Sequence, residues 1–145
     1  MHCSTVTHRA FFLYVSVLNG LSEQSRTVLY HLACLPSRGV NISLLVHLTG
    51  LKDNTIRSVL DECASLGIVT VWHDRVTFVH DKPHSATLAL IDPQDKPRLL
   101  VKIGKRLEGF SADYGFAQAD MLLGAWESDP ALLDPLEVAR ASKSY

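Results

Sequence analysis

The sequence has almost no net charge and none of the cysteine patterns of a disulfide or zinc scaffold. Its 145 residues carry 14 basic and 15 acidic side chains, a formal net charge of −1, so no global field draws the chain to nucleic acid or to an anionic membrane. The three cysteines, Cys3, Cys34 and Cys63, are odd in number, widely spaced and without a C-x-x-C. This pattern predicts reduced thiols and a cytoplasmic protein.

A long apolar run is also missing. The stretch Ala10 to Leu18 has only nine residues, whereas a membrane-spanning helix needs about 20. His8 and Arg9 before it are typical of a signal peptide, but Asn19-Gly20-Leu21 supplies no small-x-small cleavage pattern. We expect no membrane contact. Residues 1–20 are predicted only as a poorly defined N-terminal segment, either a strand or helix that packs on the main domain or the start of a truncated reading frame.

Motifs for phosphate binding and catalysis are absent from the sequence. It contains no G-x-x-x-x-G-K-[ST] and no G-x-G-x-x-G, and no Ser or Cys lies in the context of a catalytic nucleophile. His73, His80 and His84 come nearest to a metal cluster, but no Cys or third ordered ligand completes a zinc set. We therefore predict no catalytic residue, no metal site and no cofactor in this chain, which is not expected to be an enzyme.

Three helices are expected from Leu21 onward, because apolar residues recur there at helical spacing. The N-caps of the three helices are expected at Ser22, Asn41 and Asp53, and their ends at Pro36, Gly50 and Gly67, respectively. The residues expected to face inward are Val28, Leu29, Leu32, Leu35, Ile42, Leu45, Leu48, Ile56, Val59, Leu60, Cys63 and Leu66.

A β-hairpin is expected after the third helix. Two β-rich runs, Ile68–Trp72 and Arg75–Val79, are separated by the two-residue loop His73-Asp74, and Trp72 and Phe78 are expected to pack this hairpin on the core. Helix, helix, tight turn, helix and hairpin is the order typical of a winged helix-turn-helix. We assign it to residues 21–81.

Residues 82–145 are predicted to form a small helical extension, the start of a larger helical array that makes protein–protein contacts. One helix is expected over 82–91 and another from Asp92 as cap with Pro93 at its first position. Lys102, Lys105 and Arg106 are interpreted as the solvated face of that second helix. Two short helices are expected at Phe116–Trp126 and Asp134–Ser142. The predicted fold class is mainly α, a winged helix-turn-helix with a short β-hairpin wing followed by this extension.

DNA binding is the first function that such a fold suggests. The residues that could contact DNA are Lys52, Asn54, Arg57, Ser58 and Arg75. Over residues 21–80, however, five basic residues stand against five acidic ones, whereas DNA-binding modules gain affinity from an excess of positive charge. DNA is therefore an unlikely partner, and a small DNA-binding transcriptional regulator is kept as an alternative.

A family resemblance is carried by several short motifs in order along the chain. They are Leu32-Ala33-Cys34-Leu35, Gly67-Ile68-Val69, Phe78-Val79-His80-Asp81, the positions Ala86 and Ile91, and the set Ile103, Gly104 and Leu107. Together they resemble the winged-helix region that follows the nucleotide-binding core of AAA+/STAND-type signalling ATPases, as in large multidomain sensor histidine kinases. The resemblance covers roughly residues 21–107, and Val79 departs from the Met of the family's MHD motif.

The resemblance implies a regulatory role inside a larger protein. The winged helix would dock on the nucleotide-binding domain of the parent protein, which binds ADP or ATP, and His80 and Asp81 would sense the nucleotide phosphates. Asp81 would cap the next helix and orient His80. The chain alone would then be inactive. A plainer interpretation of the pair is a helix cap beside a solvated histidine, and a protein–protein adaptor without nucleotide remains a second alternative.

Overall fold

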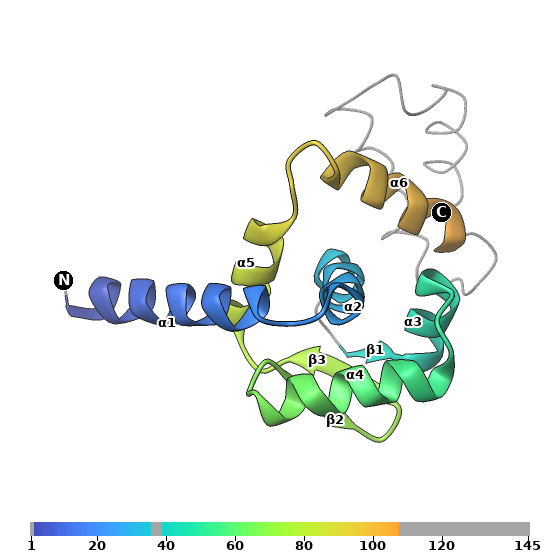
Figure 1. Cartoon of the computed structure of the whole chain (residues 1–145), viewed down its shortest axis with the longest axis horizontal. Coiled ribbons are helices and arrows are strands. Elements are labelled where there is room, and N and C mark those ends of the chain that lie inside the picture. The colour runs from blue at the N-terminus through green and yellow to red at the C-terminus, as the bar shows by residue number, and fades with distance from the viewer. Residues whose placement is uncertain (1, 36–38, 108–145) are drawn as a thin grey trace. The chain divides into compact units, whose positions relative to one another are not determined.

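The computed structural model describes residues 2–35 and 39–107 (Figure 1). These residues form six helices and one three-stranded antiparallel sheet, so the mainly helical class predicted from the sequence is confirmed. The chain divides into two compact units at Ile91–Asp92. The boundary lies one helix later than the predicted domain end at residue 81. The helices expected at Phe116–Trp126 and Asp134–Ser142 lie outside the described residues.

The N-terminal segment, whose structure the sequence left open, is the 18-residue helix α1 (His2–Asn19). It packs against α5 (Asp81–Leu90), and Leu18 near its C-terminal end is buried. Phe12 and Leu13 are 64% and 67% exposed. The N-terminal part of α1 extends away from the other elements of the first unit (Figure 1).

Helix α2 (Glu23–Cys34) begins as predicted. The Ser22 hydroxyl accepts a hydrogen bond from the backbone N–H of Ser25 at 3.1 Å, which satisfies one of the free N–H groups at a helix start. Val28, Leu29 and Leu32 on its inner side are buried. Its end at Cys34 precedes Pro36, which cannot continue a helix.

Helices α3 (Ile42–Thr49) and α4 (Asp53–Ser65) are joined by a tight turn. Gly50 ends α3 in the left-handed region, with φ 74°, and donates to the Val46 carbonyl at 2.9 Å, as expected of a glycine C-cap. Asn41 holds the predicted N-cap position of α3, but its side chain makes no capping bond. The prediction that Asp53 caps α4 is wrong, because Lys52 holds the N-cap position and Asp53 is the first helical residue, with its carboxylate bonded to Arg57.

The sheet consists of β1 (Val40–Asn41), β2 (Val69–Trp72) and β3 (Arg75–Phe78) in the order β1-β3-β2. The predicted hairpin is confirmed, with the two-residue loop at residues 73 and 74. Strand β1 was not predicted. Two residues are too few to show the alternation of apolar and polar side chains that marks a strand, and their partners in β3 lie far away in the sequence.

The side chains of the hairpin alternate between the two faces of the sheet. Val69 and Val76 are buried and Phe78 is half-buried. Trp72 is 72% exposed, so the expectation that it packs on the core is wrong. The alternation places it on the opposite face from Val69.

Helix α5 begins and ends one residue earlier than the predicted range 82–91. The sixth, α6 (Lys96–Leu107), begins later than expected, so the prediction that Asp92 caps it with Pro93 at its first position is wrong. Residues 92–95 form a turn instead. The Asp92 carboxylate accepts from the N–H of Gln94 at 2.9 Å, and its carbonyl accepts from the N–H of Asp95.

The core of the first unit lies among α2, α3 and α4 and the inner face of the hairpin. Its fully buried aliphatic residues include Val28, Leu29, Ile42, Leu44, Leu45, Leu48, Ile56, Leu60, Ile68 and Val76. Burying one such side chain stabilises the fold by about 1.5–3 kcal/mol. Helices α3 and α4 are too short to be stable alone, so this packing holds them.

Leu45→Ala is expected to lower the free energy of unfolding by about 2–5 kcal/mol, because Leu45 is fully buried and truncation leaves a cavity. The matched control is Leu66→Ala. Leu66 is 46% exposed, so the expectation that it faces inward is wrong, and its truncation is expected to cost less than about 1 kcal/mol. Urea unfolding followed by circular dichroism measures both. Equal losses in the two variants would contradict this position of the core.

Candidate functional site

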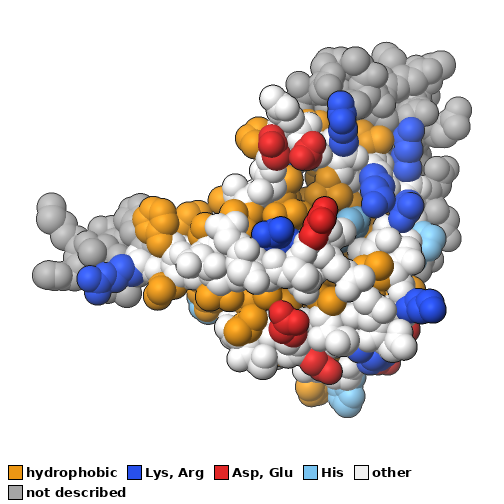
Figure 2. Space-filling view, viewed as in Figure 1, with side chains coloured by type: hydrophobic (Ala, Val, Ile, Leu, Met, Phe, Trp, Pro, Cys, Tyr) orange, Lys and Arg blue, Asp and Glu red, His pale blue; other side chains and the backbone are white. Residues whose placement is uncertain are grey.

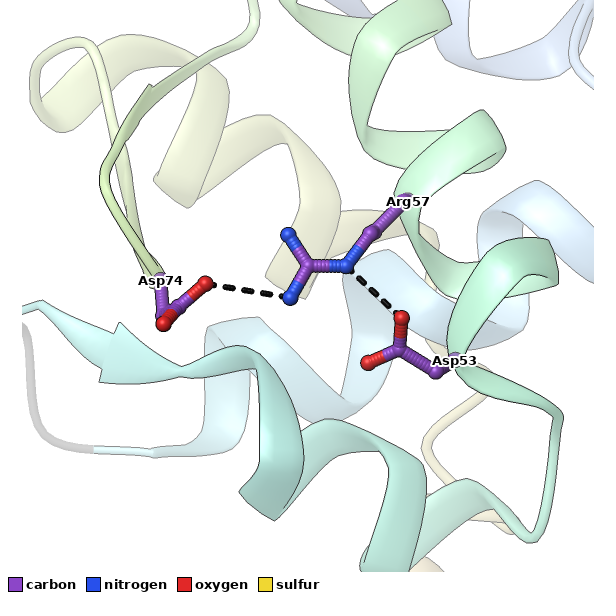
Figure 3. A network of polar contacts seen from close by, with 3 residues as sticks. All are labelled: Asp53, Arg57 and Asp74. Carbon is purple, nitrogen blue, oxygen red and sulfur yellow. Dashed lines mark hydrogen bonds and ion pairs between the residues drawn. The ribbon is translucent and has the colours of Figure 1, made fainter.

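Three charged side chains join the start of α4 to the tip of the hairpin (Figure 3). The Arg57 Nε donates to Asp53 Oδ1 at 2.7 Å, and its Nη2 donates to Asp74 Oδ1 at 3.0 Å. Asp53 lies one turn earlier on α4, and Asp74 lies in the hairpin loop. The hydrogen bond with Asp53, followed by the one with Asp74, raises the pKa of the Arg57 guanidinium. This cation is therefore engaged by carboxylates of its own chain.

The five residues predicted as possible DNA contacts are all exposed. Four of them, Lys52, Asn54, Arg57 and Ser58, belong to α4 or its N-cap, and Arg75 begins β3 beside the loop that Arg57 binds. Arg57 is linked through Asp74 to the loop beside Arg75, whereas Asn54 and Ser58 line a pocket with Ser22 and Ser25 at the start of α2. We call the exposed surface of α4 and the hairpin that carries the five residues the reading face. Asp53 and Asp74 lie on it too, so its three cations stand against two anions.

His80 lies where β3 leads into α5, and its side chain is exposed. Its Nδ1 accepts a hydrogen bond from the backbone N–H of Lys82 at 3.2 Å, which makes His80 the N-cap of α5. The prediction that Asp81 caps this helix is therefore wrong. Asp81 is the first helical residue, while the extended backbone of His80 turns the imidazole back over the helix start.

A tyrosine from α1 binds the other ring nitrogen of His80. Nε2 lies 3.3 Å from the Tyr14 hydroxyl, and the two rings meet edge to face with centroids 5.7 Å apart. Because Nδ1 is an acceptor, the neutral ring carries its proton on Nε2 and donates it to Tyr14. The Tyr14 hydroxyl in turn donates to the Gly67 carbonyl at 3.4 Å. These bonds link α1, the turn after α4 and the start of α5.

Tyr14 was not predicted as part of this site. It is 66 residues from His80 in the sequence, and the helix that carries it was expected only as one possibility for an ill-defined segment. The only signal for it in the sequence was a tyrosine within an apolar stretch. An exposed hydrogen bond between distant side chains leaves no local pattern.

A pocket of about 170 Å³ lies beside the His80–Asp81 pair. Its walls come from the end of α2, from β1 and β3, and from the start of α5, and polar and apolar surface contribute about equally to them. His84 also lines it, but its Nε2 donates to the Ala33 carbonyl at 2.8 Å and its ring packs on Phe78. This histidine therefore ties α5 to α2.

Metal binding finds no geometric support in the part of the chain that the structure describes. No group of three His, Cys, Asp or Glu side chains is placed there to hold an ion. Of the three histidines considered from the sequence, His73 lies in the hairpin loop, His80 bonds Tyr14, and His84 bonds the backbone of α2.

Cys63, a potential nucleophile by residue type, is fully buried in α4. Burial first, and the neighbouring Glu62 second, raise the pKa of its thiol to about 12. The thiol thus stays protonated at neutral pH, and only the thiolate is nucleophilic. Because the unfolded thiol, with a pKa of 9.0, ionises first, this group makes folding less favourable as the pH rises from 9.0 toward 12.

Comparison with known proteins adds no relative, since no protein-family model, no curated protein and no solved structure matches the chain. Within residues 2–35 and 39–107, no helix combines the length and apolar character needed to cross a membrane.

Cys63 is expected to react with iodoacetamide at pH 8 about a thousandfold more slowly in the folded protein than in urea, because a pKa of about 12 leaves that much less thiolate than a pKa of 9.0. Mass spectrometry of the peptide that contains Cys63 measures the rate. The control is the labelling rate of the same peptide when the whole protein is unfolded in urea. Labelling of the folded protein at the unfolded rate would contradict the burial of this thiol.

His80→Ala is expected to raise the hydrogen-exchange rate of the Lys82 amide about fivefold, because loss of an N-cap acceptor costs about 1 kcal/mol. His80→Asn is the matched variant. Asparagine is a favoured N-cap residue and is expected to keep the amide protected. Equal exchange in wild type, His80→Ala and His80→Asn would show that His80 does not cap α5.

Proposed function

We propose that residues 21–81 form a winged helix that acts as the regulatory docking module of a signalling ATPase or sensor kinase. The order α2, β1, α3, α4, β2, β3 and the sheet order β1-β3-β2 support this fold, because a helical pair joined by a tight turn and followed by a hairpin is what it requires. The partner is the nucleotide-binding domain of the parent protein, which binds ADP or ATP.

The observation that carries the proposal is the position of His80. Its exposed imidazole lies at the N-terminal end of α5, where backbone N–H groups and the helix dipole favour a phosphate. Asp81 follows it as the first residue of that helix. This is the pair that the family resemblance assigns to nucleotide sensing.

The bond between His80 and Tyr14 suggests how docking and release differ. A neutral imidazole has one N–H to donate, and here the Nε2 proton is directed to Tyr14. A nucleotide phosphate that accepts a hydrogen bond from this N–H would displace the Tyr14 hydroxyl. In the proposal, Tyr14 holds His80 when the module is undocked, and a phosphate on the partner domain holds it when the module is docked.

A DNA-binding regulator is the second candidate, because the reading face gathers all five predicted contacts. Its weakness is Arg57, whose positive charge is already offset by the carboxylates of Asp53 and Asp74. A protein–protein adaptor is the third candidate, and in that case His80 would have no effect on any nucleotide.

The proposal is tested in the complete reading frame that contains this chain, where an in-frame phosphate-binding loop upstream of Met1 is expected. His80→Ala and His80→Asn are both expected to speed ADP release about tenfold or more, because a hydrogen bond to a charged group contributes about 1.5–3 kcal/mol. The release of a fluorescent ADP analogue measures the rate.

The pair of variants separates sensing from helix capping. His80→Asn keeps the N-cap acceptor and removes the imidazole, so wild-type release in His80→Asn together with fast release in His80→Ala would mean that only the cap matters. His73→Ala, in the hairpin loop, is the control and is expected to leave ADP release unchanged. An upstream sequence without a phosphate-binding loop would refute the proposal outright.

A further inference from the structure

Helix α1 presents large apolar side chains to solvent. A surface helix typically carries polar residues on its outer side, but Phe12 and Leu13 in the middle of α1 are 64% and 67% exposed. At that exposure Phe12 alone offers about 100–160 Å² of apolar surface. Figure 2 shows hydrophobic side chains gathered along α1. Adjacent exposed apolar residues of this size, unlike single scattered ones, indicate an interaction surface.

The exposed residues in the described part of α1 form one stripe along the helix. They are Arg9, Phe12, Leu13, Ser16 and Asn19. Steps of three and four residues keep their side chains on the same face. The residues between them are buried or half-buried, because the other side of the helix packs against α5. We call this stripe the outer face of α1.

We propose that the outer face of α1 pairs with the same face in a second copy of this chain, with the two helices antiparallel. The stripe is complementary to itself when its direction is reversed. A register that sets Phe12 of each copy opposite Leu13 of the other brings four apolar side chains together about the twofold axis. The same register sets Arg9 opposite Ser16, a small side chain whose hydroxyl can accept a hydrogen bond.

Charge favours the antiparallel orientation over the parallel one. Arg9 is the one charged residue of the outer face. In a parallel pair the two Arg9 guanidinium groups would meet, and like charges at that distance repel. In the antiparallel register they lie seven residues apart, about 10 Å along the axis, which is about one Debye length at 0.1 M salt. The outer face therefore meets its own copy without a clash of charge.

The exposed area sets the strength of this pairing. Phe12 and Leu13 of two copies together expose roughly 500 Å² of apolar surface. A stable interface buries about 1,200–2,000 Å². The contact is therefore expected to be weak and reversible, with a dissociation constant on the order of 100 µM.

Other occupants fit the outer face less well. A helix that lies in a bilayer interface has a strongly charged polar face opposite its apolar one, whereas α1 has a single cation on its outer face and is held by α5 on the other side. An unrelated protein is selected by complementary charges around an apolar centre. One charge gives such a partner little to recognise, while a second copy supplies matching apolar residues.

The pairing goes beyond the docking function, because it concerns the outer face of α1 and neither His80 nor the winged helix. Its test is sedimentation equilibrium of the full chain at about 5–500 µM, a range that brackets a weak dimer. The average mass is expected to rise with concentration from that of the monomer, 16.0 kDa, toward twice that value.

The double variant Phe12→Gln, Leu13→Gln is expected to weaken the dimer at least about tenfold, because it removes the apolar centre of the contact. Both side chains are exposed, and glutamine is a good helix former. The variant is therefore expected to fold, which circular dichroism checks. The matched control is Trp72→Gln, since Trp72 is a large exposed apolar residue on the hairpin. It is expected to leave the association unchanged.

The orientation is tested by Arg9→Gln. In the antiparallel pair this change is expected to alter the affinity less than about twofold, because Arg9 meets no other charge. A tighter dimer in Arg9→Gln would show that the two arginines meet, and it would overturn the antiparallel arrangement.

Four further results would overturn the proposal. They are a wild-type chain that stays monomeric at the highest concentration, a dimer that persists in Phe12→Gln, Leu13→Gln, a dimer lost in Trp72→Gln, and a monomer whose outer face binds phosphatidylserine vesicles instead. None of these measurements involves ADP release, so the docking function stands or falls separately.

Discussion

The apolar packing among α2, α3 and α4 is the constraint on which the other features depend. A helix has two sides, and burial of Ile56 and Leu60 fixes which side of α4 meets solvent. Arg57 and Ser58 then have to point outward. The same core holds the inner face of the hairpin, so the loop with Asp74 ends beside α4 and within reach of Arg57. The composition of the reading face is thus a consequence of the core.

Charge is distributed unevenly along the chain. On the reading face the central cation, Arg57, is engaged by two carboxylates from its own chain, which weakens the local positive field. Within α6 the basic residues come without a single acidic neighbour on the same helix. An almost neutral total charge therefore conceals a strong local contrast.

Much of this fold could be predicted from local patterns. Helical spacing, Ser22 as an N-cap, Gly50 as a C-cap and the two-residue hairpin loop are all encoded within a few neighbouring residues. The failures have a common cause. Asp53 and Asp81 are good cap residues by type, but Arg57 engages Asp53, and an extended His80 takes the cap that Asp81 was expected to form. Strand β1 and the Tyr14–His80 bond depend on partners far away in sequence, which no local pattern specifies.

The hydrogen bond of Tyr14 holds helix α1 at a point far from the N-terminal end of that helix. Tyr14 lies twelve residues from the start of the helix at His2, a length of about 18 Å at 1.5 Å per residue. In the proposed exchange of partners at His80, this length of helix would act as a lever whose pivot lies near His80. A tilt of about 10° at the pivot displaces the free end by about 3 Å, as follows from that length. The proposed exchange of partners at one imidazole nitrogen would thereby become a displacement of about 3 Å at the N-terminal end of α1.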